Sequence, residues 1–175
     1  MGRVGVWLFA LSCVLYAMAV AWAWIALPEG PIPSHWSTLG PGPADGWSSR
    51  GGTLGFMVGM GIFVGGIFAA IMAIFMTSKL FPGLNIPNKD YWTRPENIDE
   101  TRRRSLTDMG TFGAATMLLL IDMVVMTVFA ARTPNGQSPP WSGVAFGVFM
   151  AYAIWFTIWT ATKRWKIPPE GTLHV

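Results

Sequence analysis

Four long runs of apolar residues dominate the chain, and stretches rich in proline, glycine and charge separate them. The runs cover residues 4–27, 53–76, 109–131 and 144–162. A helix of about 20 apolar residues, rising about 1.5 Å per residue, crosses a hydrocarbon core of roughly 30 Å. The pattern therefore predicts one all-α membrane domain over residues 1–175, built as a bundle of four transmembrane helices.

The composition also indicates that lipid is the solvent for most of the surface. Apolar residues make up 52% of the chain and charged residues 12%, against about 25% charged residues in soluble domains. The first run has a rival interpretation as a signal peptide, because Ala21-Trp22-Ala23 resembles a cleavage site. Its apolar length exceeds the roughly 7–15 residues of a signal-peptide core, so we expect a helix of the mature protein.

Basic residues gather on one side of the predicted membrane. Of the twelve Lys and Arg residues, ten lie on the side of the predicted membrane that also holds both chain ends. Arg50 and Arg132 lie on the opposite side. The ten are Arg3, Lys79, Lys89, Arg94, Arg102, Arg103, Arg104, Lys163, Arg164 and Lys166. Because basic residues near helix ends mark the cytoplasmic side, we predict a multi-pass protein of a bacterial cytoplasmic membrane. Both termini and residues 77–108 would be cytoplasmic, and residues 28–52 would lie outside.

The same bias accounts for the net charge of +3, so membrane lipids are expected partners and nucleic acid is not. Cys13 is the only cysteine, which excludes an internal disulfide and a cysteine-based metal cluster. The methionines, Met57, Met60 and Met123 among them, lack nearby His or Cys at ligand spacing. We interpret them as adaptable packing residues.

Glycines at four-residue spacing, Gly51, Gly55 and Gly59, lie just before and at the start of the second run. Such a row lets a neighbouring backbone approach closely, so we expect residues 53–76 to form the central helix. The row faces either another helix of this chain, which we favour, or a partner membrane protein or second copy in a homo-oligomer.

The loop before the third run predicts a short cytoplasmic surface helix over about residues 94–104. Thr93 and Glu96 have the spacing of a capping box, and the acids Asp99 and Glu100 precede Arg103 and Arg104 by four residues, which favours two ion pairs. The Arg102–Arg104 run suits anionic lipid headgroups and, alternatively, a docking partner. The docking candidates are Lys89, Asp90, Tyr91, Trp92, Arg102, Arg103 and Arg104.

The loop over residues 28–52 is rich in proline and glycine, so we expect neither helix nor sheet there. Its aromatic and ionisable side chains suggest a loop folded down on the helix ends as a recognition surface for an extracytoplasmic peptide or lipid. The candidate ligand-binding residues are His35, Trp36, Asp45, Trp47 and Arg50. A weak divalent-metal site of His35, Glu29 and Asp45 is the less favoured alternative, and we expect no metal.

Two motifs resemble one known family. The first is Leu27-Pro28, a short gap, then Ile32-Pro33-Ser34-His35-Trp36 and Asp45-Gly46-Trp47, and the second is Ile86-Pro87-Asn88-Lys89-Asp90-Tyr91-Trp92. Together they resemble, over about residues 4–131, the small membrane domain of unknown function at the N-terminus of SdpI-type immunity proteins. The resemblance implies a membrane domain related to immunity or signalling proteins. The fourth apolar run departs from that front domain, so toxin immunity does not follow from the likeness.

Asp122 is the only charged residue inside the four runs. A carboxyl near the middle of a bilayer costs at least about 2.5 kcal/mol, so we expect it to face the bundle interior in its neutral form. Thr116, Thr157 and Thr160 are its expected hydrogen-bond partners. A proton-responsive site and a purely structural hydrogen bond both remain open.

Enzyme and cofactor motifs are absent: the sequence has no phosphate-binding glycine loop, no zinc-ligand pair and no Gly-x-Ser-x-Gly turn. We therefore expect no enzyme and no cofactor. The favoured function is a membrane binding or interaction protein. The alternatives are an accessory subunit of a larger membrane complex and a small proton-coupled transporter that uses Asp122.

Overall fold

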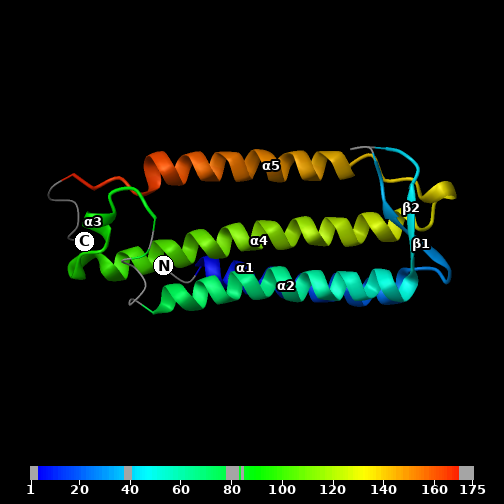
Figure 1. Ribbon diagram of the computed structural model, residues 1–175, viewed down its shortest axis with the longest axis horizontal. Coiled ribbons are helices and arrows are strands. Elements are labelled where there is room, and N and C mark those ends of the chain that lie inside the picture. The colour runs from blue at the N-terminus through cyan, green and yellow to red at the C-terminus, as the bar shows by residue number, and fades with distance from the viewer. Residues whose placement is uncertain (1–3, 38–40, 78–82, 84, 170–175) are drawn as a thin grey trace.

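The computed structural model describes residues 4–37, 41–77, 83 and 85–169. Four long helices run alongside one another: α1 (Val4–Ala26), α2 (Arg50–Met76), α4 (Ile98–Ala130) and α5 (Ser142–Trp159) (Figure 1). Each is long and apolar enough to cross a membrane, which confirms the four predicted apolar helices. Arg3 and Lys79, which contribute to the orientation prediction, lie outside the described residues.

Short elements occupy the two ends of the molecule. One end, here called the hairpin end, carries β1 (Pro31–His35), β2 (Gly46–Ser49) and the 3-10 turn η3 (Pro134–Gly136). The opposite end, here called the basic end, carries α3 (Lys89–Trp92), the 3-10 turn η2 (Pro95–Asn97) and the π-helical η4 (Thr160–Arg164) that extends α5. Figure 1 shows these two groups separated by the full length of the long helices.

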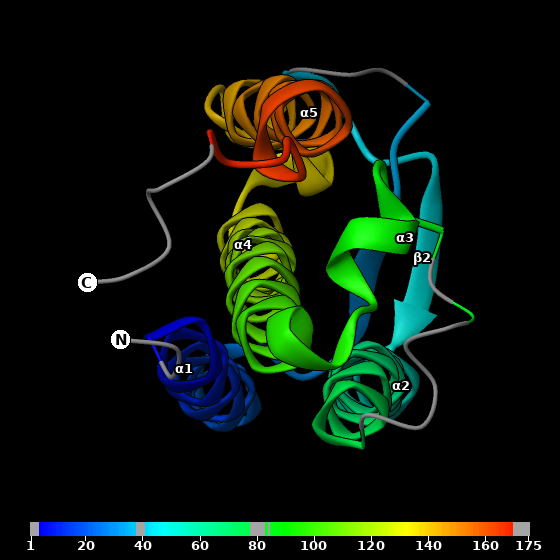
Figure 2. The same cartoon turned by 90° about the vertical axis from the view of Figure 1, so that its left-hand side faces the viewer.

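The central helix is α4, which packs against α1, α2 and α5. In Figure 2, α1 and α2 lie on one side of α4, and α5 lies on the other. The prediction that residues 53–76 form the central helix is therefore wrong. A Cβ atom on Gly110 would lie 2.3 Å from the carbonyl carbon of Gly5, so glycines of α1 and α4 make the close helix crossing. Gly51, Gly55 and Gly59 of α2 meet nothing within 4 Å among the described residues.

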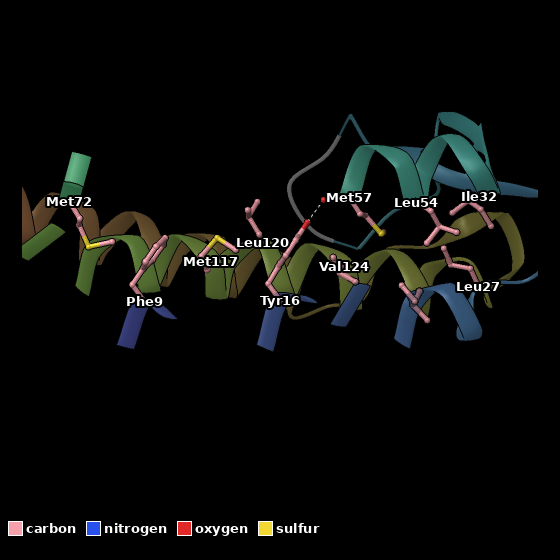
Figure 3. Close-up of a cluster of buried hydrophobic side chains, with 12 residues drawn as sticks. Phe9, Tyr16, Leu27, Ile32, Leu54, Met57, Met72, Met117, Leu120 and Val124 are labelled. Carbon is pink, nitrogen blue, oxygen red and sulfur yellow. Dashed lines mark hydrogen bonds between the residues drawn. The ribbon is translucent and has the colours of Figure 1, made fainter. Parts of the chain in front are cut away.

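Apolar side chains from α1, α2 and α4 form the core, which Figure 3 shows as one continuous row. Phe9 and Met117 lie towards the basic end of this row, and Leu27 and Ile32 close it at the hairpin end. Between them, the Tyr16 hydroxyl donates to the Met57 carbonyl at 2.5 Å. The core thus links α1 to α2 directly as well as through α4.

The predicted short surface helix is not a separate element, because α4 runs without interruption from Ile98. Of the two predicted ion pairs, Glu100–Arg104 is confirmed, with 2.7 Å between Oε1 and Nε. The Asp99–Arg103 pair is wrong: Arg103 also pairs with Glu100, and Asp99 lies 3.1 Å from Arg102. Spacings of three and four residues are both neighbours on a helix, so the sequence pattern admits either choice.

The expectation of a loop without sheet over residues 28–52 is also wrong. β1 and β2 pair antiparallel, in the register Pro31↔Ser49, Ile32↔Ser48, Pro33↔Trp47 and His35↔Gly46, with an irregularity between Pro33 and His35. In a two-stranded sheet every strand has one edge that needs no partner. Proline is tolerated where its missing N–H would face that edge, which is how Pro31 and Pro33 fit within a strand.

Candidate functional site

The hairpin is fastened to the connection between α4 and α5. Trp36 donates its indole N–H to the Gly136 carbonyl at 2.9 Å. The Ala44 amide donates to the Asn135 carbonyl at 3.0 Å, and the Ser138 amide donates to the Gly42 carbonyl at the same distance. Gly136 has a φ of +61°, and a Cβ atom there would lie 2.7 Å from the Pro33 side chain and 2.9 Å from the Trp47 ring. The hairpin is therefore a fixed cap on the helix ends.

His35 and Asp45 form a polar pair on the open side of this cap. His35 Nδ1 lies 2.5 Å from Asp45 Oδ1, and the Ser37 amide donates to Asp45 Oδ2 at 3.0 Å. The hydrogen bond with His35 holds the pKa of the Asp45 carboxyl below its ordinary value. Since the His35 side chain is 69% exposed, the pair faces the surroundings and is available to a ligand.

Arg50 is placed differently from the other predicted ligand-binding residues. Its guanidinium lies 3.1 Å from the Glu29 carboxylate and donates to the Trp24 carbonyl at the end of α1. It therefore ties α1 to the start of α2 and does not join the His35–Asp45 pair. Glu29 is engaged with Arg50, and among the described residues no group of three His, Cys, Asp or Glu side chains gathers as a metal site.

A cavity of about 470 Å³ lies beneath the hairpin, between α2 and α4. The hairpin contributes Trp36 and Trp47, and the helices contribute mainly apolar and thioether side chains: Phe56, Met57, Met60, Leu120, Met123, Val124 and Met126. The volume falls within the roughly 300–1,000 Å³ of typical small-molecule sites. Phe56 and Met123 are 64% and 45% exposed, so the cavity opens sideways, towards the apolar surroundings of the helices.

Thr53 is the unusual polar residue in this lining. It is only 7% exposed, and its hydroxyl is buried without a hydrogen-bond partner in the described part of the chain. The other threonines of the described long helices donate to backbone carbonyls, as Thr127 does to Met123 at 2.8 Å on the same cavity. Sequence reasoning missed both the cavity and Thr53, because no local pattern shows that a hydroxyl is left unpaired.

Asp122 is half-buried between α4 and α5. It lines an open groove between α4 and α5 together with Leu118 and Tyr152, and the structure gives it no hydrogen bond among the described residues. Its expected partners are engaged elsewhere, since Thr116 donates to the Phe112 carbonyl at 3.0 Å. Thr157 and Thr160 likewise donate to carbonyls of their own helix.

The residues predicted for cytoplasmic docking separate into buried and exposed members. Trp92 is fully buried and donates its indole N–H to the Trp165 carbonyl at 2.9 Å, so it is not available to a partner. The Arg104 guanidinium stacks 4.4 Å from the Trp92 ring and donates to the Arg164 carbonyl at 2.7 Å. The exposed members are Lys89, Asp90 and Arg103, while Tyr91 and Arg102 are partly covered.

An ion pair between Arg164 and Asp108 completes this cluster at the basic end. Arg164 of η4 meets Asp108 of α4 through two contacts of 2.9 Å, one to each carboxylate oxygen. Asp108 borders a cavity of about 550 Å³ whose lining also includes Phe75, Met109 and Phe156. Because Arg164 already holds the Asp108 carboxylate, we interpret this pair as the attachment of α5 to α4.

Comparisons with protein-family models, with curated proteins and with solved structures find no match for this chain. The likeness to the front domain of SdpI-type immunity proteins therefore stays a prediction from the two sequence motifs. The geometry of the hairpin end is the ground for a functional proposal.

Proposed function

We propose that this chain is a membrane binding protein that takes a hydrophobic extracytoplasmic ligand into the cavity under the hairpin. The observation that carries the proposal is the position of the cavity, which lies between a fixed polar cap and two apolar helices. With the orientation expected from the basic residues, the hairpin end is outside and the basic end is cytoplasmic. A ligand in the cavity would then lie in the outer half of the bilayer.

The lining suits a ligand with an apolar body and a polar end. Methionine side chains are flexible and polarizable, so Met57, Met60 and Met123 adapt to an irregular apolar shape. Trp47 offers an aromatic contact in the lining, and the His35–Asp45 pair of the same hairpin offers hydrogen-bonding groups. In this arrangement the cap recognises the polar end, and the helices hold the apolar body out of water.

The test is to purify the intact chain in mild detergent and to identify bound molecules by native mass spectrometry. The wild type is expected to retain a small hydrophobic molecule. Met60→Trp, which fills the cavity, is expected to lose it, whereas Met76→Trp, at an exposed position of the same helix, should keep it. Equal retention by the two variants would place the ligand elsewhere and reject the proposal.

A second candidate function is an accessory subunit of a larger membrane complex, as the sequence alternative suggests. It is favoured by the face of α2 that carries Gly51, Gly55 and Gly59, which meets no other described part of the chain. Glycine faces allow close approach of another transmembrane helix. Copurification of a stoichiometric membrane protein, lost in Gly55→Leu and kept in Gly147→Leu on α5, would support this function; its absence would argue against it.

A further inference from the structure

Thr53 gives the cavity under the hairpin a specific chemical requirement. Its hydroxyl is buried and has no hydrogen-bond partner among the described residues, and Thr53 is one of the residues that line the cavity. A buried hydroxyl without a partner is unfavourable, because it has lost its hydrogen bonds to water and gained none. A bound molecule with a hydrogen-bond acceptor at this position removes that cost.

We infer that the ligand is a diacyl glycerolipid of the outer leaflet, one of whose ester carbonyls accepts a hydrogen bond from the Thr53 hydroxyl. This inference rests on the proposed function and names the chemical class of its ligand. One acyl chain would lie between α2 and α4, among Met57, Met60 and Met123, and its headgroup would lie beside the hairpin.

The depth of Thr53 matches the ester region of a lipid. It follows the first residue of α2, Arg50, by three residues, which corresponds to about 4.5 Å of helix rise. Arg50 and the tryptophans Trp24 and Trp47 mark the boundary between headgroups and hydrocarbon, where these residue types concentrate. A carbonyl located one turn deeper than Arg50 lies at the start of the acyl chains.

The polarity of the lining favours a lipid over a hydrophobic peptide. Among the described residues no charged side chain lines the cavity, and the hydroxyls in its lining beyond the hairpin strands are those of Tyr16, Thr53 and Thr127. Tyr16 and Thr127 already donate to the Met57 and Met123 carbonyls. A peptide would bring an amide and a carbonyl with every residue, each costly when unpaired in an apolar site. An acyl ester brings one carbonyl, for which Thr53 is the free donor.

The test compares two probes that differ only in this carbonyl: a diester phosphatidylglycerol and its dialkyl ether analogue, both carrying a photoreactive diazirine on one chain. The intact chain is placed in nanodiscs with each probe, and crosslinking to cavity residues is quantified by peptide mass spectrometry. A typical net hydrogen bond corresponds to a preference of about fivefold. We expect the ester probe to label the wild type more strongly than the ether probe by that factor. Thr53→Ser should keep this preference, and Thr53→Val should be labelled equally by the two probes.

Thr53→Val is expected to fold, because it removes a hydroxyl that has no partner and keeps the side-chain shape. Equal labelling of the wild type by ester and ether, or a preference that survives in Thr53→Val, would overturn the inference. Retention of a peptide in place of either lipid would reject the lipid class and leave the proposed binding function standing. Labelling that Met60→Trp leaves unchanged would reject both, since the probe would then occupy no site in the cavity.

Discussion

Tyr16 of α1, which lines the cavity under the hairpin, fits closely against Gly61 of α2. A Cβ atom on Gly61 would lie 2.2 Å from the Tyr16 ring, so only glycine leaves room for it. The ring is held there because its hydroxyl donates to the Met57 carbonyl at 2.5 Å. This contact fixes α2 against α1 and holds Tyr16 in the lining of the cavity.

Replacing Gly61 should therefore destabilise the protein. Gly61→Ala is expected to lower the thermal unfolding temperature in detergent, because Tyr16 must leave its position, and Tyr16→Phe should cost about 1 kcal/mol through the lost hydrogen bond. Gly55→Ala is the matched control, since nothing lies within 4 Å of Gly55. Equal unfolding temperatures for the Gly61 and Gly55 variants would contradict this packing.

The crossing of α1 and α4 gives a second prediction. Gly110→Ala would place a methyl group 2.3 Å from the Gly5 backbone, and backbone atoms have no alternative rotamer to adopt. We expect loss of the folded monodisperse protein in size-exclusion chromatography. Gly147→Ala of α5, with open space around it, should elute as the wild type. A well-behaved Gly110→Ala protein would show that α1 and α4 do not cross here.

Asp108 and Asp122 of α4 should respond in opposite ways to substitution. Asp108→Leu leaves Arg164 without its partner, and breaking such a pair costs about 3–5 kcal/mol. Asp122→Leu removes a carboxyl that costs at least about 2.5 kcal/mol at membrane depth and has no hydrogen bond in the described structure, so the variant should be at least as stable as the wild type. Chemical unfolding of both variants checks this. Destabilisation by Asp122→Leu would point to a partner for Asp122 outside the described residues.

The proton-coupled alternative has its own measurement. Asp122→Asn keeps the size of the side chain and cannot ionise. If transport of any solute by reconstituted protein is found, and Asp122→Asn alters its dependence on pH, the carrier alternative gains support. If the chain is instead a binding protein as proposed, Asp122→Asn should retain the ligand as well as the wild type does. The groove that holds Asp122 is separate from the cavity under the hairpin.

The hairpin should loosen in acid. A carboxyl whose pKa is lower in the folded protein stabilises the fold above its ordinary pKa, and this contribution is lost as the pH falls through the lowered value. For Asp45 the ordinary value is 3.8, so the cap should be fully held at neutral pH and loosen below 3.8. Tryptophan fluorescence of Trp36 and Trp47 reports the change. Asp45→Asn should abolish this acid step, whereas Asp90→Asn at the basic end should keep it.

The sequence predicts the four long helices well because the length of an apolar run is a local property. The Glu100–Arg104 pair is likewise local, since it needs only one helical turn. The β-hairpin was missed because strand pairing is non-local: Pro33 looks incompatible with a sheet until Trp47 is known to lie opposite it. The central helix was misassigned for a similar reason, since Gly5 and Gly110 are single glycines far apart in the chain, whereas the row on α2 is conspicuous and faces outwards.

Prediction of the site was limited in the same way. His35, Asp45 and Trp36 share one loop, and the structure brings them into the cap. Arg50 belongs to the same loop but pairs with Glu29 at the helix ends. No sequence pattern indicates that Arg50 pairs with Glu29 and not with Asp45. Thr53 looks like any helical threonine, and only the positions of all neighbouring carbonyls show that its hydroxyl is unpaired.

The attachment of the hairpin has a consequence for how this protein divides into parts. The sequence motifs make residues 4–131 look like a self-contained front unit, yet the cap bonds to Asn135, Gly136 and Ser138. A fragment that ended at residue 131 would keep the helices that line the cavity and lose the anchors of its lid. The connection between α4 and α5 therefore belongs to the same structural unit as the hairpin, and a truncation before residue 135 would remove the contacts that hold the cap in place.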